Sequence, residues 1–358
     1  VREGLQRTGP GLPGQHVHDL RGAGPGPRPG RPRCGHPRLR ADGRYPAQEA
    51  RTRQAQEKVM ALTAGIIGLG NIGCGVAANL AAAGHHVIGY DLDPERITAA
   101  SAEAGVDAAD VAARTDLVVL AVATLPAWRA TLAAISASGR RGLVVVDLCT
   151  FPIEEKVDAH DELARAGIDL LDCPVSGARP QALSGDLAML VSGSEDAFAR
   201  VQPALESFCR SVIHVGAFGE SAKFKYILNL IISIHNMACA EAFLLARKAG
   251  VDLELMTEAV MQSAAYSKIF EVRAEKWITG DYDDPTAELA IQLKDKDVIR
   301  DFAAGLNCPT PMFDATMPYY IAAASQGRQK QDAASILAVL EHMAGIPRDE
   351  PPVAKDGD

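Results

Sequence analysis

The sequence predicts an α/β protein in which a doubly wound parallel sheet is followed by an all-helical domain, with a long helix joining the two. From Met60 onward, short apolar runs alternate with helical segments, a pattern typical of parallel sheets. Residues 251–345 show no alternating stretch and are rich in strong helix formers. Between these regions, residues 216–250 open with glycines and then read helical without a break for more than twenty-five residues, ending at Gly250.

The expected strands define one edge of the sheet as the place for ligands. In doubly wound sheets, ligands bind beyond the carboxyl ends of the strands, so the loops after the third, fourth and fifth strands should line one cleft. Leu125 and Pro126 lie beyond the third strand and Thr150 beyond the fourth, which makes them candidate cofactor contacts. The expected strands cover 63–68, 86–91, 116–122, 143–148, 169–172, 187–192 and 211–215, and the helices between them include 72–83 and 195–208.

The loop between the first strand and the first helix has the pattern of a dinucleotide-binding turn. Gly68 permits the tight turn, Gly70 lets the backbone approach a pyrophosphate, and Gly73 lets the helix pack closely on the strand. Asn71 and Ile72 complete the loop and lead to the helix N-terminus, which favours anions. These five residues are therefore expected to bind the cofactor.

The residue at the end of the second strand indicates whether the cofactor is NAD or NADP. Asp91 lies eighteen residues after Gly73, where a ribose-binding acid is expected. A carboxylate accepts hydrogen bonds from both ribose hydroxyls but repels a 2′-phosphate, and no arginine follows it directly. NAD is therefore expected, and Arg96 is close enough in sequence to leave NADP open.

The long helix combines an apolar body with a polar stripe. Lys225, Asn229, Ser233 and Asn236 follow one another at steps of four, four and three, which places them on one face. The polar residues that interrupt the apolar run would be costly in lipid, so a membrane span is disfavoured. The stripe is either a solvated edge of a core helix or a place for chemistry.

The two ends of the chain have no such patterns. Residues 1–59 hold 12 of the 36 Lys+Arg and 5 of the 45 Asp+Glu, with ten Gly and eight Pro. We expect this segment to be a disordered or non-native extension and 347–358 to be a disordered tail. The seven cysteines are scattered and form no metal motif, and no secretory signal is seen, so we expect a cytoplasmic protein without a bound metal.

Beyond the fifth strand the sequence resembles the β-hydroxyacid dehydrogenases, the family of 3-hydroxyisobutyrate dehydrogenase and tartronate semialdehyde reductase. The run DCPVSG at 172–177 and the run GDLA at 185–188 are similar to the substrate-binding signature of that family. Lys225 with Asn229 four residues on, and Lys294 with Asp295, match two further motifs. The resemblance covers residues 61–346.

The resemblance implies both an arrangement and a set of roles. It implies a Rossmann domain at 60–220 and a helical substrate and dimerisation domain at 221–346. Ser176 and Gly177, with Thr150, would bind the substrate, and Lys225 would be the acid/base. Asn229 would orient the substrate, and Lys294 would close over cofactor and substrate.

Four departures from the family pattern leave the substrate open. Ala178 stands where a third glycine is usual, Cys149 replaces a common serine, Ser221 replaces a glycine, and Ala287 replaces a phenylalanine. Most of these positions fall in the expected substrate region. They change the shape of the site more than its reaction.

The function we expect is oxidoreduction between a small β-hydroxy acid and its semialdehyde, with hydride transfer to or from NAD. Lys223 is the rival base, but helical geometry turns it away from Asn229. The alternatives are a relative of the imine reductases, or a catalytically silent NAD-binding scaffold, and the retained Lys225 argues against both. A 6-phosphogluconate dehydrogenase would need a longer helical domain.

The expected partners are a small carboxylic acid and further copies of the chain. We expect a homodimer or homotetramer and neither a membrane nor a nucleic acid partner. The apolar surface for self-association is expected from residues of the helical domain, namely Met312, Phe313, Met317, Tyr319 and Tyr320.

Overall fold

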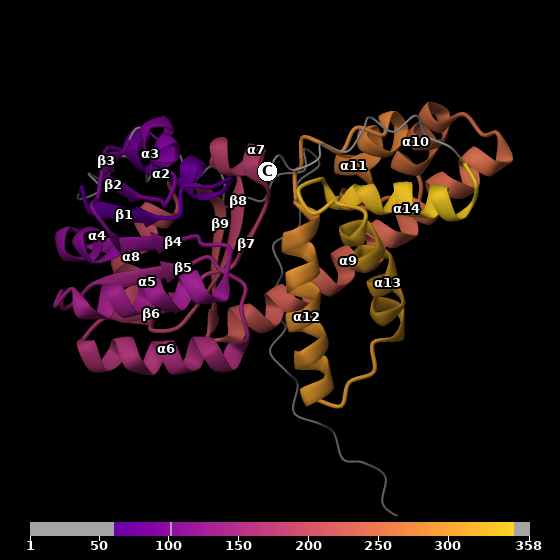
Figure 1. Ribbon diagram of the computed structural model, residues 1–358. Coiled ribbons are helices and arrows are strands. Elements are labelled where there is room, and N and C mark those ends of the chain that lie inside the picture. The colour runs from indigo at the N-terminus through magenta and orange to yellow at the C-terminus, as the bar shows by residue number, and fades with distance from the viewer. Residues whose placement is uncertain (1–60, 101, 347–358) are drawn as a thin grey trace, which may run out of the picture. The chain divides into compact units, whose positions relative to one another are not determined.

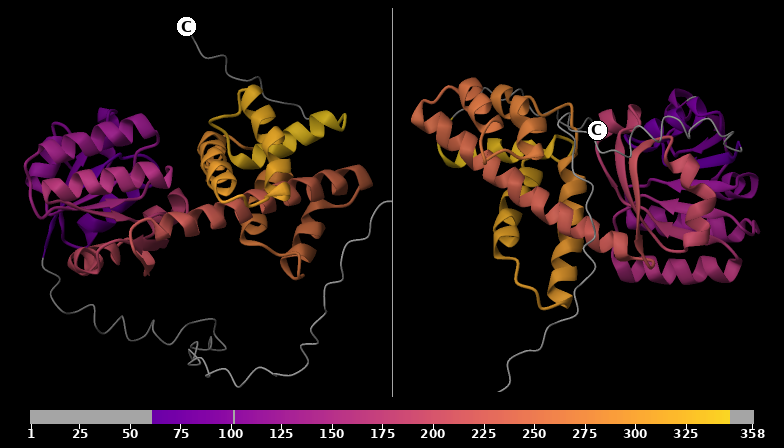
Figure 2. Two further views of the ribbon diagram at one scale, coloured as in Figure 1. Left: turned by 90° about the horizontal axis from the view of Figure 1, so that it is seen from below. Right: turned by 180° about the vertical axis from the view of Figure 1, so that it is seen from behind.

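The computed structural model describes residues 61–100 and 102–346, so the expectations for 1–59 and 347–358 lie outside the described residues. The first part of this region folds as a sheet with helices on both faces (Figures 1 and 2), which confirms the predicted fold class. The strands are β1 (Thr63–Ile67), β2 (His86–Tyr90), β3 (Glu103–Ala104), β4 (Leu117–Leu120), β5 (Val144–Asp147), β6 (Asp169–Asp172), β7 (Val175–Ser176), β8 (Leu187–Ser192) and β9 (Cys209–Gly216). The helices are α2 (Gly73–Ala82), α3 (Pro94–Ala99), α4 (Ala108–Arg114), α5 (Leu125–Ala137), α6 (Ile153–Ala166), α7 (Arg179–Leu183) and α8 (Glu195–Leu205).

The strand order is β3-β2-β1-β4-β5-β6-β8-β7, with β9 also pairing with β8. Strands β1 to β6 are parallel, but β8 pairs antiparallel with β6 and parallel with β9. The prediction of a parallel sheet was therefore wrong for its last part. Apolar runs indicate a buried strand but not its direction, which depends on how the preceding segment crosses the sheet.

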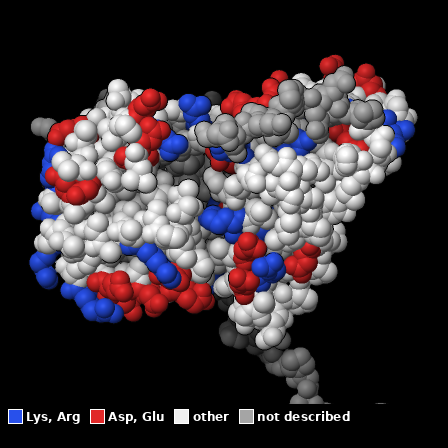
Figure 3. Space-filling model, viewed as in Figure 1, with Lys and Arg blue, Asp and Glu red and all other residues white. Residues whose placement is uncertain are grey.

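Both faces of the parallel strands are buried, which explains their continuous apolar runs. In β4, Leu117 and Val119 face the side covered by α2 and α8, while Val118 and Leu120 face α4, α5 and α6. The exposed face of α6 carries acidic side chains (Figure 3). These include Glu154, Asp158, Asp161 and Glu162.

The second part of the described chain is helical, as predicted. Its helices are α9 (Glu220–Ala249), α10 (Leu253–Met261), α11 (Lys268–Thr279), α12 (Leu289–Gly305), α13 (Pro311–Ser325) and α14 (Ile336–Met343), with the 3₁₀ turn η1 (Ala333–Ser335). Helix α9 packs against the other helices of this part (Figure 2), and its Ala240 and Phe243 are fully buried among them. By length and composition alone α9 could cross a membrane, but here it packs against α10, α11, α12, α13 and α14.

The apolar surface of the helical part differs from the prediction. Phe313, Met317 and Tyr320 are buried between helices, and only Met312 is well exposed. Exposed apolar side chains are scattered over several helices of this part, and four of them lie together on the N-terminal half of α9, at Phe224, Ile227, Leu228 and Ile231. Their spacing of i, i+3, i+4 and i+7 makes one continuous stripe, called here the α9 apolar stripe.

Candidate functional site

The glycine loop has the geometry that a bound pyrophosphate would need. Gly68 has φ +92°, and a Cβ on it would lie 2.3 Å from the carbonyl oxygen of Ala121. A Cβ on Gly73 would lie 1.9 Å from the Gly68 carbonyl oxygen, so this residue must be glycine for α2 to pack on β1. Around Gly70 the nearest atom to a Cβ is 3.8 Å away, so its space is open to a ligand.

The N-terminus of α2 also fits an anion. Ile72 is the N-cap residue and makes no side-chain cap, and the first turn contains no acidic residue. Partial positive charge from the helix dipole is therefore left for a ligand. Asn71 is exposed at the tip of the loop.

Asp91 lies beside this loop and helps to shape it. One carboxylate oxygen accepts a hydrogen bond from the backbone N–H of Leu69 at 2.7 Å, and the other accepts one from Asp93 at 2.9 Å. The Arg96 guanidinium lies 3.7 Å from Asp91. The Asp91 carboxylate is thus held next to the glycine loop, and the Arg96 guanidinium lies close to it.

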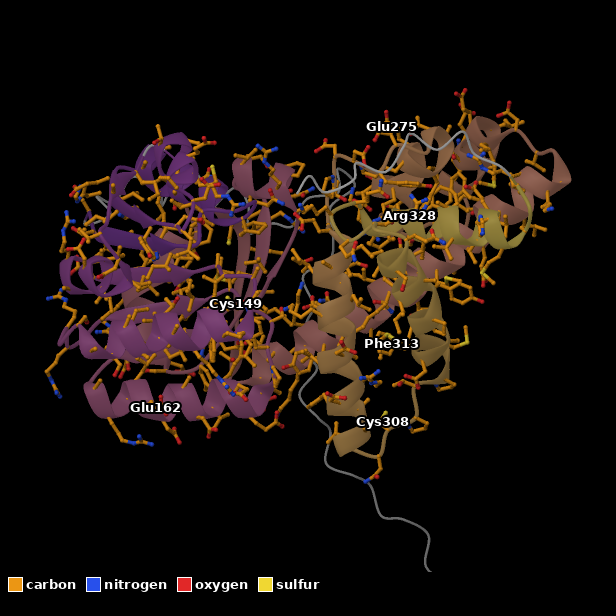
Figure 4. All side chains as sticks on the ribbon, in the orientation of Figure 1. Cys149, Glu162, Glu275, Cys308, Phe313 and Arg328 are labelled. Atoms are coloured by element: carbon orange, nitrogen blue, oxygen red, sulfur yellow. The ribbon has the colours of Figure 1, made fainter. Side chains whose placement is uncertain are left out.

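The loops after β4 and β5 come together at the same edge of the sheet. Leu125 and Pro126 form the first turn of α5, which Thr124 caps. Cys149 is buried directly after β5 (Figure 4), and burial raises the pKa of its thiol well above the usual range. Thr150 is partly exposed, and its carbonyl oxygen accepts a hydrogen bond from Lys294 Nζ at 2.6 Å.

The expected substrate loop follows β6. Ser176 ends β7 with an exposed side chain, and Gly177 has φ +141°. A Cβ on Gly177 would lie 2.7 Å from Leu187 Cδ2, so a larger residue here would strain the backbone and displace the Leu187 side chain. Ala182, a member of the same signature, is instead a packing residue, since its backbone meets α2 at Gly75.

Lys225 reaches this loop from the second turn of α9. Its Nζ donates a hydrogen bond to the Val175 carbonyl oxygen at 2.9 Å, next to Ser176. Burial of the amine lowers the pKa of Lys225, Asp295 acts in the opposite direction, and Lys294 lowers this pKa further. Lys223 lies on the surface and pairs with Glu220, so it does not compete for this position.

Asp295 is a residue of the site to which the sequence reasoning gave no role. Its Oδ2 accepts a hydrogen bond from Asn229 Nδ2 at 2.9 Å, and its Oδ1 lies 2.8 Å from Lys294 Nζ. Lys294 also lies over the ring of Phe151, with 4.7 Å from Nζ to the ring centroid. The adjacency of Lys294 and Asp295 is visible in the sequence, but only the packing of α12 beside α9 gives Asp295 its contact with Asn229.

The polar stripe of α9 divides into two parts. Lys225 and Asn229 belong to the cluster just described, but Ser233 is buried and bonds to its own helix at Asn229. Asn236 is fully buried, where it donates to Tyr320 and accepts from Arg273 inside the helical core. The stripe is therefore a candidate site in its first half and a structural network in its second.

The fold and this cluster together define a nicotinamide-dinucleotide-dependent dehydrogenase, with a dinucleotide-binding domain and a helical domain that supplies the lysines. Residues 63–216 match the NAD-binding domain of 6-phosphogluconate dehydrogenase, and residues 219–340 match the NAD-binding domain of NADP-dependent 3-hydroxyisobutyrate dehydrogenase.

Individual proteins that are similar to this chain indicate which kind of dehydrogenase it is. The chain is 31% identical to an L-threonate dehydrogenase of Haemophilus influenzae, over 77% of this chain and 94% of that protein. It is 30% identical to 2-hydroxy-3-oxopropionate reductase of Escherichia coli, over 78% of this chain and 97% of that protein. A crystal structure of 3-hydroxyisobutyrate dehydrogenase from Salmonella typhimurium has a TM-score of 0.72 and 29% identity, and the match covers 77% of this chain and 99% of that one.

The chain therefore belongs to the β-hydroxyacid dehydrogenase family. It is an oxidoreductase that uses NAD(P) and interconverts a hydroxy acid and its semialdehyde.

Proposed function

We propose that Lys225 is the general acid/base of this reaction and that a small β-hydroxy acid is held by Ser176, Gly177 and Thr150. The observation that carries the proposal is the placement of the enclosed Lys225 amine against the backbone of the expected substrate loop, with Asn229 one turn away. The lowered pKa of Lys225 favours the neutral amine, which is the form that can accept a proton.

The proposed roles follow from donor and acceptor chemistry. When bound, the nicotinamide would accept or deliver the hydride. Lys225 would take the hydroxyl proton during oxidation, and in reduction the protonated amine would return it to the alkoxide. A carboxylate only accepts hydrogen bonds, so Asp295 turns the Asn229 amide nitrogen toward itself and fixes how that amide faces the substrate. Lys294 would draw the loop at Thr150 toward the bound cofactor.

We infer that NAD is preferred to NADP, with Gly68, Gly70, Asn71, Ile72, Gly73, Asp91, Leu125, Pro126, Thr150 and Lys294 as the cofactor contacts. Asp91 offers a carboxylate to the ribose, and a 2′-phosphate would meet the same charge. NADH and NADPH dissociation constants, measured by fluorescence titration, should differ by at least about tenfold in favour of NADH. Equal or tighter NADPH binding would assign Arg96 the role of a phosphate contact and reject this preference.

The substrate is best sought among small hydroxy acids, beginning with threonate because the similar protein from Haemophilus influenzae is named for it. NAD reduction would be followed with threonate, glycerate, 3-hydroxyisobutyrate, 3-hydroxypropionate and serine. Lys225→Ala should lower kcat by about a thousandfold, with NADH binding retained. The matched control is Lys223→Ala on the same helix, which should stay within about twofold of wild type. An active Lys225→Ala protein would exclude Lys225 as the acid/base.

We also propose that the chain functions in the cytoplasm as a homodimer or homotetramer, with neither a membrane nor a nucleic acid partner. The α9 apolar stripe supports self-association. The six cysteines in the described part carry free thiols, as expected in a reducing compartment. The net charge of −9 and the acidic face of α6 would repel nucleic acid. We place the domain boundary between residues 220 and 221, so that all of α9 after its first residue belongs to the helical domain.

A further inference from the structure

Behind the site, five polar side chains are buried together where β5, β6 and β8 end and α9 begins. They are at most 1% exposed, and they come from five elements, namely β5, α6, β6, β8 and α9. We call them the α9 anchor cluster. Its members are Asp147, Lys156, Asp172, Ser192 and Ser221.

The cluster supplies the N-terminal cap that α9 itself lacks. Gly219 is the N-cap residue and has no side chain to accept a hydrogen bond. Ser192 Oγ accepts hydrogen bonds from the backbone N–H groups of Gly219 and Ser221, at 3.1 and 3.2 Å. Asp172 Oδ2 accepts one from Ala222 N–H at 2.9 Å. The start of the helix is thus bound to the ends of β8 and β6.

The Ser221 hydroxyl joins the two caps. It lies 2.6 Å from both Ser192 Oγ and Asp172 Oδ2. The Ser221 hydroxyl also lies 2.7 Å from the backbone carbonyl oxygen of Asp172. Both Asp172 oxygens only accept, so the single hydrogen of Ser221 is donated to Asp172, and Ser192 donates to Ser221. Loss of this hydroxyl would leave both partners buried with one hydrogen bond fewer.

Lys156 supplies the positive charge of the cluster and links Asp172 to Asp147 at the end of β5. Its Nζ bonds to Asp172 Oδ1 and lies 3.1 Å from Asp147 Oδ2. Burial lowers the pKa of Lys156, but Asp147 and Asp172 outweigh that effect, so the pKa is raised and the ammonium is kept. One ammonium against two carboxylates leaves one negative charge, which faces the positive end of the α9 dipole.

Three of the segments that the cluster holds, those of Asp147, Asp172 and Ser221, also carry a group of the site. Asp147 accepts a hydrogen bond from the Cys149 N–H, directly before Thr150. Asp172 lies three residues before the carbonyl group of Val175 that accepts from Lys225. Helix α9 carries Lys225 itself, five residues after the helix begins. A displacement of the cluster would therefore move Lys225 relative to both loops.

We propose that Lys156 and Ser221 are positioning residues, which hold the start of α9 so that Lys225 is aligned with the substrate and cofactor loops. This rests on the proposed function of Lys225. Misalignment of a reacting group by about 1 Å can lower a rate by about a hundredfold, so small shifts of the helix have measurable effects.

The test compares Ser221→Ala and Lys156→Met with Thr115→Val. Thr115 has a fully buried hydroxyl just before β4, at the amino end of the parallel strands, so Thr115→Val matches the loss of a buried hydroxyl without touching the cluster. We expect kcat to fall about tenfold or more in Ser221→Ala, with the NADH dissociation constant within about twofold of wild type and Thr115→Val fully active. The pH midpoint of kcat/KM should also move in Ser221→Ala and not in Thr115→Val.

A folded Ser221→Ala protein with wild-type kcat and an unmoved pH midpoint would overturn the proposal. If Lys156→Met does not fold, Ser221→Ala alone decides. If wild type turns over no hydroxy acid, the proposed function of Lys225 has failed. The positioning role is then decided by the pH at which Lys225 reacts with an amine reagent, followed by peptide mass spectrometry. A shift in Ser221→Ala would support positioning, and no shift would reject it.

Discussion

At the residue scale, the protonation of Lys225 is set by opposing neighbours. Its amine is enclosed, and two charged side chains from α12 act on it with opposite signs. The same two residues, Lys294 and Asp295, form an ion pair at 2.8 Å, so a change in one removes the ion-pair partner of the other. The amine at the centre of the proposed reaction is therefore tuned by a second helix.

This arrangement predicts opposite pH effects for two substitutions. Oxidation requires the neutral amine, so kcat/KM should rise with pH through the lowered pKa of Lys225. Asp295→Asn removes an anion that raises this pKa, so the midpoint should move to lower pH. Lys294→Met removes a cation that lowers it, so the midpoint should move to higher pH.

The measurement is kcat/KM for hydroxy acid oxidation against pH. Asp297→Asn is the matched control, because Asp297 lies on the same helix but is exposed and pairs with Arg300. It should leave the midpoint unchanged. Shifts of both variants in the same direction would contradict this electrostatic explanation.

Lys296 is a buried lysine outside the site, and we expect it to lower the free energy of unfolding. It is fully buried, with Nζ 4.4 and 4.1 Å from the ring centroids of Phe313 (Figure 4) and Tyr320, and bonded to Thr316. Burial lowers the pKa of Lys296 to about 7, while Asp314 acts in the opposite direction. No carboxylate forms an ion pair with it within the described residues.

Lys296→Met should therefore raise the free energy of unfolding by about 1–3 kcal/mol at pH 6.5. The unfolded chain binds the proton up to about pH 10.5 and the folded chain only up to about pH 7, so wild-type stability should rise with pH between these values. The difference in the free energy of unfolding between Lys296→Met and wild type should therefore be smaller at pH 9 than at pH 6.5. Urea unfolding at pH 6.5 and 9 measures both, and an advantage that does not change with pH would contradict the assignment.

At the scale of elements, the turn between β1 and α2 separates glycines needed for folding from a glycine needed for the ligand. A Cβ on Gly73 would lie 1.9 Å from a backbone oxygen, whereas a Cβ on Gly70 would have no neighbour closer than 3.8 Å. The two residues occupy one loop, and the motif already gives them different roles. Their surroundings predict different consequences of the same substitution.

Gly70→Ala should leave the free energy of unfolding within about 0.5 kcal/mol of wild type and raise the NADH dissociation constant at least about tenfold. Gly73→Ala should lower the free energy of unfolding by about 2 kcal/mol or more, because α2 must move from β1. Chemical denaturation and fluorescence titration of both variants measure these effects. Unchanged NADH binding in Gly70→Ala would show that the pyrophosphate lies elsewhere.

At the scale of the whole molecule, the α9 apolar stripe predicts self-association. Ile227 and Ile231 are 56% and 42% exposed, one turn apart on the outer side of the helix that carries Lys225. Burying both against a second copy would remove large apolar side chains from water. Each would then contribute about 1 kcal/mol or more to assembly.

Ile227→Glu combined with Ile231→Glu should convert the assembly to monomers. Light scattering after size-exclusion chromatography gives the mass. Leu255→Glu is the control, since Leu255 is 65% exposed on α10, away from the stripe. A wild-type protein that is monomeric at micromolar concentration, or a double variant that keeps its assembly, would exclude this surface as the interface.

Local patterns were sufficient to predict much of this protein. The alternation of apolar runs with helices, the spacing of Gly68, Gly70 and Gly73, and the position of Asp91 all depend on residues close together in the chain. Backbone geometry and burial constrain such neighbours directly, so the sheet, the turn and the helical part could be predicted. The placement of Lys225 beside the loop after β6 followed from the resemblance.

Tertiary structure decided what each polar residue contacts. It gave Asp295 its contact with Asn229, separated Asn236 from the site, and reversed β8 within the sheet. It also buried Lys156 between two carboxylates and left the α9 apolar stripe exposed. Each of these outcomes depends on side chains that are distant in sequence, and periodicity carries no information about which distant segments will pack together.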